Sequence, residues 1–173
     1  MKTLLLIRHA KSSWKDPGLE DHARPLNKRG TRDAPDMGQR LDAWLRAHNA
    51  GGPDLWLSSS AERAQATSRL IAREITVETP SIEFTGALYT FDPEVLLGMI
   101  QRFEPSVQKA WIVGHNPAIE ELAEWLTGRV LPKVPTCALL QIRLEAPRWR
   151  EVAQHGAELV WFDYPKSTRA GLG

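Results

Sequence analysis

Cysteine is nearly absent from this sequence of 173 residues, which contains only Cys137. A single cysteine cannot form an intramolecular disulfide, so a fold held together by internal disulfide bonds is excluded. A domain of this length does not need them, because it buries roughly two thirds of the surface that its unfolded chain exposes. The cysteine content favours a reducing compartment, and we expect a cytoplasmic protein.

An excess of charge of either sign is also lacking, since 22 lysines and arginines stand against 21 aspartates and glutamates. A dedicated nucleic-acid-binding domain carries a basic excess, so we expect no nucleic-acid partner. Long hydrophobic runs are missing too, and near the amino terminus only residues 4–7 are continuously apolar. That run is too short for a signal peptide or a membrane span, so we expect no membrane association. The sequence leaves the oligomeric state open.

What the sequence does contain is an alternation of strand and helix patterns. Short apolar runs predict strands at residues 4–7, 55–57, 110–113, 139–144 and 159–162. Apolar residues three and four positions apart predict helices around residues 37–45, 64–75, 95–100 and 119–126. This order predicts βαβ units, and hence an α/β fold with a mainly parallel central sheet in a three-layer α/β/α sandwich.

Spacing and proline predict two details of this fold. The last two predicted strands are too close for a helical crossover, so we expect them to pair antiparallel at an edge of the sheet. Pro35 is tolerated best in the opening turn of a helix, so we expect the first long helix to begin between Asp33 and Asp36. Repeats and linkers are missing, and we expect a single domain over residues 1–173.

Four residues suited to phosphoryl transfer stand where predicted strands end. Arg8 and His9 end the first strand, Arg63 lies in the first helical turn after the second, and His115 follows the strand at residues 110–113. Ligands of open α/β sheets bind beyond the carboxyl ends of the strands. Guanidinium groups clamp phosphoryl oxygens in bidentate fashion, and an uncharged imidazole nitrogen can attack phosphorus. The arrangement predicts a phosphate site with a nucleophile.

Three segments resemble motifs of the histidine phosphatase superfamily in its SixA-type branch. They are Leu-Ile-Arg-His-Ala-Lys-Ser at residues 6–12, the segment 58–67 with Arg63-Ala64 and Thr67, and Val-Gly-His-Asn-Pro at residues 113–117. Arg24-Pro25-Leu26-Asn27, Arg29-Gly30 and Leu88-Tyr89 match the same branch. The resemblance implies a phosphoglycerate mutase-like fold. It also implies that His9 accepts the phosphoryl group, that Arg8 and Arg63 hold its oxygens, and that His115 stabilises charge beside them.

The resemblance further implies a phosphatase that needs neither metal nor cofactor. Its expected partner is a phosphorylated protein, such as a histidine-containing carrier. Two alternatives stay open, which are a small-molecule phosphomonoesterase or pyrophosphohydrolase using the same site, and a phosphate-binding module without turnover. Further donors to the substrate phosphate are expected from Lys11, Ser12, Ser13 and Lys15.

The sequence departs from other branches of the superfamily at the general acid. Mutase-like and acid-phosphatase members carry a carboxylate there, whereas the corresponding residues 86–90 read Gly-Ala-Leu-Tyr-Thr. Asp21, Glu20 and Glu83 are the available substitutes. In addition, Lys15 stands where mutase-like members commonly carry an asparagine, which disfavours phosphoglycerate mutase chemistry.

Two competing sites have weaker support. Cys137 and Arg143 have the Cys-x5-Arg spacing of cysteine-dependent phosphatases, but the residues between them lack glycine and alternate like a strand. This pattern favours a small buried cysteine over a phosphate-binding loop. A metal site including His9 and His115 has no His-rich or His-x-x-x-His spacing to support it, so we expect none.

Overall fold

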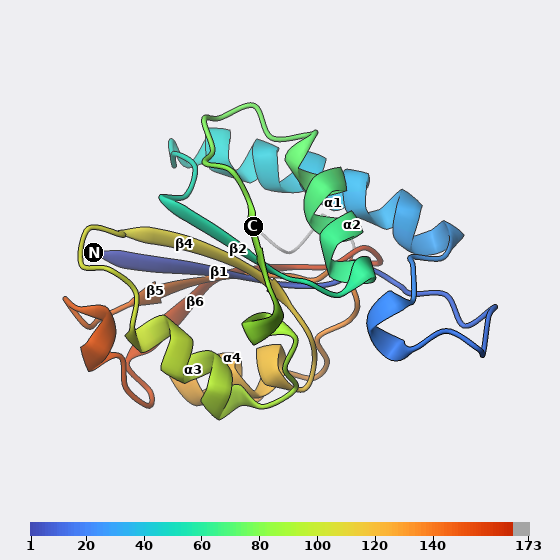
Figure 1. Cartoon of the computed structure of the whole chain (residues 1–173). Helices are drawn as coiled ribbons and strands as arrows, with labels where there is room; N and C mark the ends of the chain where they lie inside the picture. Colours follow the sequence, from blue (N-terminus) through green and yellow to red (C-terminus); the bar gives the residue numbers. More distant parts are fainter. Residues whose placement is uncertain (168–173) are drawn as a thin grey trace.

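The structure is a computed structural model that describes residues 1–167, so residues 168–173 of the expected domain lie outside it. A six-stranded sheet forms its centre, with α1 and α2 on one face and α3 and α4 on the other (Figure 1). The strands are β1 (Lys2–Arg8), β2 (Leu55–Ser59), β3 (Glu83–Thr85), β4 (Lys109–Gly114), β5 (Leu139–Leu144) and β6 (Ala157–Asp163). The helices are α1 (Lys28–Ala47), α2 (Glu62–Ala72), α3 (Pro93–Gln101) and α4 (Ala118–Thr127), with 3-10 turns η1 (Asp21–Ala23), η2 (Gly86–Leu88) and η3 (Trp149–Glu151).

The sheet is mixed, so the mainly parallel sheet that the sequence predicts is confirmed in part: three of the strand pairs described are parallel and two are antiparallel. Its order is β3-β2-β4-β1-β5-β6; β3, β2, β4 and β1 are parallel, and β5 runs antiparallel to β1. The expected antiparallel pairing of β5 with β6 at an edge is confirmed. The direction of β5 follows from residues 128–138, which return the chain to the edge where β1 ends, so that Cys137 N donates to Arg8 O at 3.0 Å.

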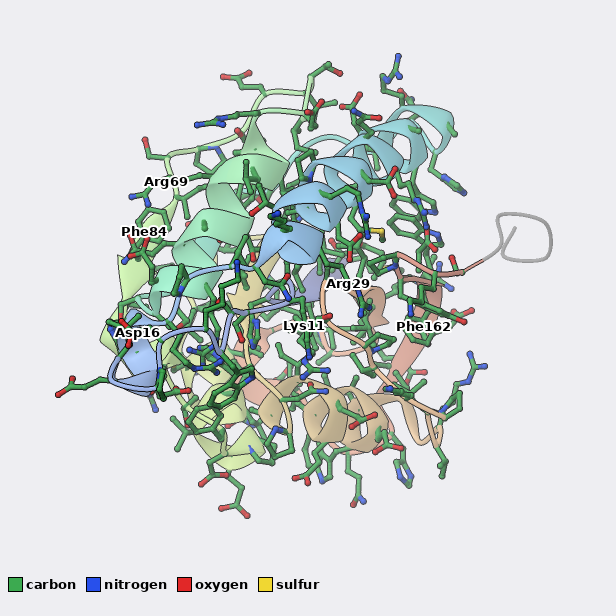
Figure 2. The ribbon with its side chains drawn as sticks, turned by 90° about the vertical axis from the view of Figure 1, so that its right-hand side faces the viewer. Lys11, Asp16, Arg29, Arg69, Phe84 and Phe162 are labelled. Carbon is green, nitrogen blue, oxygen red and sulfur yellow. The ribbon has the colours of Figure 1, made fainter. Side chains whose placement is uncertain are left out.

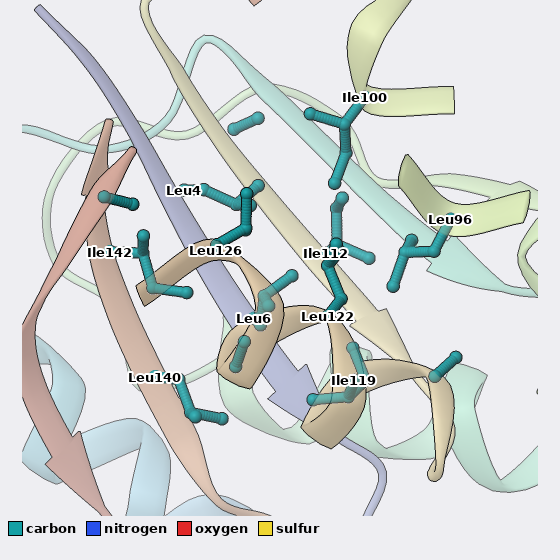
Figure 3. Close-up of a cluster of buried hydrophobic side chains, with 14 of the residues drawn as sticks. Leu4, Leu6, Leu96, Ile100, Ile112, Ile119, Leu122, Leu126, Leu140 and Ile142 are labelled. Atoms are coloured by element: carbon teal, nitrogen blue, oxygen red, sulfur yellow. The ribbon is translucent and has the colours of Figure 1, made fainter. Parts of the chain in front are cut away.

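Strand β1 lies in the middle of the hydrophobic core. Alternate side chains enter the two faces, so Leu4 and Leu6 pack with α3 and α4 whereas Leu5 and Ile7 pack with α1 and α2. Figure 3 shows Leu4 and Leu6 beneath the apolar side chains of α4. Each leucine buried in this way contributes roughly 2 kcal/mol to stability. The end of β1 is therefore held rigidly on both faces.

Helix α1 begins at Lys28, so the start expected between Asp33 and Asp36 is wrong. Asn27 caps the helix by accepting a hydrogen bond from Gly30 N at 2.8 Å, and Pro35 lies inside the helix. Gly30 lies in the first turn of the helix, where a Cβ atom would lie 2.2 Å from Lys11 O. Only glycine lets the first turn of α1 approach the segment that follows β1 so closely.

Candidate active site

The two histidines of the predicted site leave the sheet side by side. Strands β1 and β4 are parallel neighbours in which Arg8 is paired with Gly114, so the next residues, His9 and His115, emerge together. Their ring centroids are 5.1 Å apart. Because the carboxyl ends of parallel strands share one edge, this part of the site follows directly from strand order.

Arg63 joins the histidines from the opening turn of α2. Strand β2 pairs with β4 through Ser58 and Val113, and α2 begins three residues after β2 ends. His9, Arg63 and His115 are only 7%, 2% and 1% exposed. Three of the four residues predicted for the core of the site are thus buried together.

The contacts of His9 determine which ring nitrogen is free. Its Nδ1 lies 2.7 Å from Ala10 O, and because a carbonyl oxygen only accepts, Nδ1 carries the proton. Nε2 then keeps its lone pair and accepts from Arg63 Nε at 3.4 Å. The unprotonated nitrogen of His9 therefore faces the guanidinium group, as a nucleophile for an anionic centre requires.

His115 has the opposite tautomer. Arg63 Nη2 lies 3.4 Å from His115 Nδ1 and only donates, so Nδ1 accepts. The proton of the ring is then on Nε2, which donates to Ser59 Oγ at 2.8 Å. Ser59, at the end of β2, orients the His115 ring, and this contact was not predicted from the sequence.

Both imidazoles are uncharged near neutral pH. Burial, reinforced by the neighbouring positive charges, lowers the pKa of His9 from 6.5 to about 3. Burial and the charge of Arg63 lower the pKa of His115 to about 4. An uncharged His9 is the form that can attack phosphorus.

These shifts predict a loss of stability in acid. Below pH 6.5 the unfolded chain protonates His9, whereas the folded protein does not until about pH 3, so stability falls as the pH falls through this window. At pH 5 the loss is roughly 2 kcal/mol for this residue. The free energy of unfolding of His9→Asn, measured by urea denaturation, should fall less between pH 7.5 and 5 than that of the wild type. His48→Asn, which keeps both buried imidazoles, should behave like the wild type. An equal fall in the free energy of unfolding for all three proteins would contradict the prediction.

Arg8 has a free donor at the end of β1. Its Nη1 donates to Val134 O at 2.9 Å, while its buried Nε has no hydrogen-bond partner among residues 1–167. Burial lowers the pKa of Arg8. A buried donor without a partner is uncommon, and at this edge of the sheet Arg8 Nε is available to a ligand.

Asp21, in the segment between β1 and α1, contacts Arg63. Its main-chain O accepts from Arg63 Nη1 at 2.7 Å, and its Oδ2 accepts from Arg63 Nη2 at 3.0 Å. Burial alone would raise the pKa of Asp21, but hydrogen bonds from Tyr89, Arg63 and Arg24 hold this pKa well below its usual range. An ionised Asp21 has no proton to give, so it does not fit the role of a general acid for which the sequence made it a candidate.

Comparison with known proteins agrees with this geometry. Residues 4–87 match the model of the histidine phosphatase superfamily, branch 1. An uncharacterised protein of Mycobacterium leprae is 33% identical over 172 residues, covering 92% of this chain and 100% of the relative. The chain belongs to the histidine phosphatase superfamily. An uncharacterised chloroplast protein of Arabidopsis thaliana is 31% identical over 160 residues, covering 87% of this chain and 70% of the relative.

Solved structures place this superfamily member near the SixA branch. A candidate phosphohistidine phosphatase SixA from Agrobacterium tumefaciens is 29% identical, with a TM-score of 0.77 and coverage of 95% of this chain and 98% of that chain. The structure of a protein histidine phosphatase SixA with tungstate has a TM-score of 0.73 at 20% identity, covering 94% and 97% of the two chains. The latter likeness concerns the fold.

Within residues 1–167, no hydrogen bond joins the four predicted substrate-binding residues to His9, Arg63 or His115. Ser12 Oγ is buried and accepts from Arg24 Nη1 at 2.9 Å. Ser13 and Lys15 line a separate cavity of about 550 Å³. Figure 2 shows Lys11 near the middle of the side that faces right in Figure 1. A role for these residues in holding the substrate stays a prediction.

The other two candidate acids lie at exposed positions. Glu20 precedes η1 and makes no capping hydrogen bond through its side chain. Glu83 begins β3, two residues before Thr85, which pairs with Ser59 at the site edge. Neither resembles a carboxyl group held in an apolar pocket, which is how a general acid keeps its proton.

Aromatic rings surround His115 in this superfamily member, and the sequence did not single them out as site residues. The rings of Tyr89 and Phe91 lie 5.4 and 5.3 Å from that of His115. Phe91 is 46% exposed, an unusual position for a large apolar side chain. Tyr89 and Phe91 thus form the outer wall of the site.

The competing cysteine site has the wrong local structure. Cys137 is fully buried, and burial raises the pKa of its thiol. Arg143 lies on β5, where it forms an ion pair with Glu158. A buried, protonated thiol before a strand cannot act as a thiolate nucleophile.

Within residues 1–167, no group of three or more His, Cys, Asp or Glu side chains is placed to hold a metal ion. In this part of the chain, no helix has both the length and the apolar character needed to cross a membrane.

Proposed function

We propose that the protein is a phosphatase that works through a phosphohistidine intermediate on His9, and that its substrate is phosphohistidine on another protein. One observation carries the proposal: the lone pair of neutral, buried His9 faces Arg63 in a site where the nearby carboxylate, Asp21, is ionised. The site thus has a nucleophile and cationic donors but no proton donor for the leaving group.

In the first step, His9 Nε2 attacks phosphorus in line with the leaving group. A bond from Nε2 to phosphorus forms while the bond to the leaving nitrogen breaks, and the electron pair stays on that nitrogen. Arg8, Arg63 and His115 stabilise the charge on the equatorial oxygens. Arg63 and His115 act more strongly because their side chains are buried, at 2% and 1% exposure.

In the second step, a water oxygen attacks phosphorus and the bond from phosphorus to Nε2 breaks, while the protons of the water stay on the inorganic phosphate that is released. The proton that Nδ1 shares with Ala10 O is still present after Nε2 has been phosphorylated. His9 therefore departs as a neutral imidazole, and its lone pair is restored without a further acid. The hydrogen bond to Ala10 serves both steps.

The missing acid favours phosphohistidine as the substrate. A phosphoimidazole that is protonated on its other ring nitrogen leaves as neutral imidazole, whose conjugate acid has a pKa of about 6.5. An alkyl phosphate must instead expel a strongly basic alkoxide. Asp21 cannot provide the proton that an alkoxide needs, because its pKa is held well below the usual range.

Access to the site supports a protein substrate. At the edge that carries His9, the connections at residues 9–27, 60–61, 86–92 and 115–117 contain nothing longer than a three-residue 3-10 turn. No inserted subdomain within residues 1–167 covers this edge. The likeness to a candidate phosphohistidine phosphatase SixA at 29% identity is a second support.

A substrate panel tests the proposal. It compares a carrier protein phosphorylated chemically on histidine with an activated aryl phosphate, a sugar phosphate and a nucleotide. We expect the phosphohistidine protein and the aryl phosphate to be turned over, and the sugar phosphate and nucleotide to react at least about 10²-fold more slowly. Preference for the sugar phosphate or nucleotide would favour the small-molecule alternative, and binding without turnover of any compound would favour the phosphate-binding module.

The same panel with EDTA tests whether a metal ion takes part. Arg8 and Arg63 supply the positive charge that a metal would otherwise bring. Turnover should therefore be the same with and without the chelator. Loss of activity that is restored by a divalent cation would contradict a metal-independent reaction.

A further inference from the structure

Arg63 is held along two different edges of its guanidinium group. Nε and Nη2 form the edge that faces the site, with His9 Nε2 and His115 Nδ1 each 3.4 Å away. Nη1 and Nη2 form the other edge, and both donate to Asp21, at 2.7 Å to its main-chain O and 3.0 Å to its Oδ2. Asp21 thus occupies the edge that the phosphoryl group does not need.

Asp21 is itself fixed from two separate parts of the chain. Arg24 donates to Oδ1 through Nε at 3.2 Å and Nη2 at 3.1 Å, and Tyr89 donates its hydroxyl proton to Oδ2 at 2.5 Å. Arg24 is buried, bound by Ser12 Oγ and packed at 3.5 Å against the ring of Trp14. The carboxylate therefore has little freedom to move away from Arg63.

The charges of Arg63 and Asp21 also favour the contact between the guanidinium and the carboxylate. Arg63 is 2% exposed, and a buried guanidinium without a partner is strongly destabilising. Asp21 carries the opposite charge, and its hydrogen bonds favour the ionised form, as the lowered pKa of this carboxyl group reflects. A carboxylate that stays ionised can orient a guanidinium at any pH at which the protein works.

We propose that Asp21, fixed by Arg24 and Tyr89, is the positioning residue of Arg63 and keeps the inner edge of the guanidinium directed at the phosphoryl oxygens. This inference rests on the proposed function and adds residues to its machinery. It also gives a role to Arg24 and Tyr89, two members of the segments that resemble the SixA branch. Asp21 acts through Arg63 and does not exchange a proton with the substrate.

Removal of the carboxylate should slow every substrate by the same factor. We expect Asp21→Ala to lower kcat/KM about 10- to 100-fold, because a misplaced charge-assisted donor costs roughly one to two powers of ten. The factor should be equal for aryl phosphates with good and with poor leaving groups. A loss that grows with the pKa of the leaving group would identify Asp21 as a proton donor and overturn the proposal.

A double-mutant cycle tests whether the effect passes through Arg63. In the Arg63→Ala background, Asp21→Ala should change kcat/KM by less than about 2-fold, since its partner is gone. The same loss in both backgrounds would mean that Asp21 only stabilises the segment around it, and would overturn the proposal. Glu20→Ala removes the exposed neighbouring carboxylate and is the matched control, expected to react like the wild type.

Two further measurements keep the result interpretable. Asp21→Asn keeps one acceptor oxygen, which Tyr89 and Arg63 can share, but loses the acceptor for Arg24. It should therefore fold and recover part of the activity lost in Asp21→Ala. No recovery in a folded Asp21→Asn overturns the proposal. The affinity for inorganic phosphate, measured by calorimetry, gives the double-mutant cycle a readout that does not depend on turnover. If the wild type hydrolyses nothing, the proposed function fails. The effects of Asp21→Ala and Arg63→Ala on phosphate binding then still test the further inference. Non-additive effects support the positioning of Arg63 by Asp21, and additive effects overturn it.

Discussion

We expect His9→Asn to lower kcat by roughly 10⁴- to 10⁶-fold on every substrate, which is the usual cost of removing a covalent nucleophile. Asparagine is similar in size but has no ring nitrogen to attack phosphorus. Arg8, Arg63 and His115 stay in the variant, so binding of inorganic phosphate should weaken far less than turnover. That separation of binding from chemistry identifies the nucleophile.

Rapid quenching with labelled substrate measures the intermediate directly. The wild type should give a phosphoprotein that is labile in acid and stable in base, and His9→Asn should give none. His48→Asn, at the exposed end of α1, is the matched control and should be labelled normally. Normal turnover by His9→Asn, or label found on Cys137, would show that the mechanism is wrong.

The second large effect concerns the leaving group. A positioned general acid contributes about 10² to 10⁴ in rate, or roughly 3 to 5 kcal/mol. Because Asp21 is ionised and Glu20 and Glu83 are exposed, this contribution is missing here. We expect rates to fall steeply as the leaving-group pKa rises, with alkyl phosphates at least about 10²-fold slower than activated aryl phosphates.

A series of aryl and alkyl phosphates measured at one pH checks this dependence. Glu83→Gln and Glu20→Gln should leave the slope of rate against leaving-group pKa unchanged. If alkyl and aryl phosphates react equally fast, and one of these substitutions abolishes the reaction of the alkyl phosphates, a general acid exists. The phosphomonoesterase alternative would then explain the protein better.

That His9, Arg63 and His115 come together could be predicted from the sequence, for a simple geometrical reason. His9 and His115 each follow an apolar run, and parallel neighbouring strands bring such residues together regardless of their distance in the chain. Arg63 follows its strand by four residues, which is within the first turn of α2. The ends of predicted strands therefore indicate which residues meet, because the hydrophobic pattern that defines each strand also defines where the edge of the sheet lies.

Other features depend on contacts that leave no local pattern. Helix α1 contains Pro35 in its interior, and Gly30 in its first turn lies too close to Lys11 O to carry a side chain. Strand β3 has only three residues, too few for a periodic signal. Asp21 stands in a polar segment, and only the folded chain shows that its carboxylate binds Arg63.

The central place of β1 has a consequence for the order in which the molecule assembles. The hydrogen-bonding partners of β1 are β4 and β5, which begin at Lys109 and Leu139. During synthesis, the first strand therefore has no neighbour to pair with until more than one hundred further residues have left the ribosome. Contacts so distant in sequence form slowly, because a long loop must close before they gain any energy. The site around His9 therefore cannot be complete before His115 has been made.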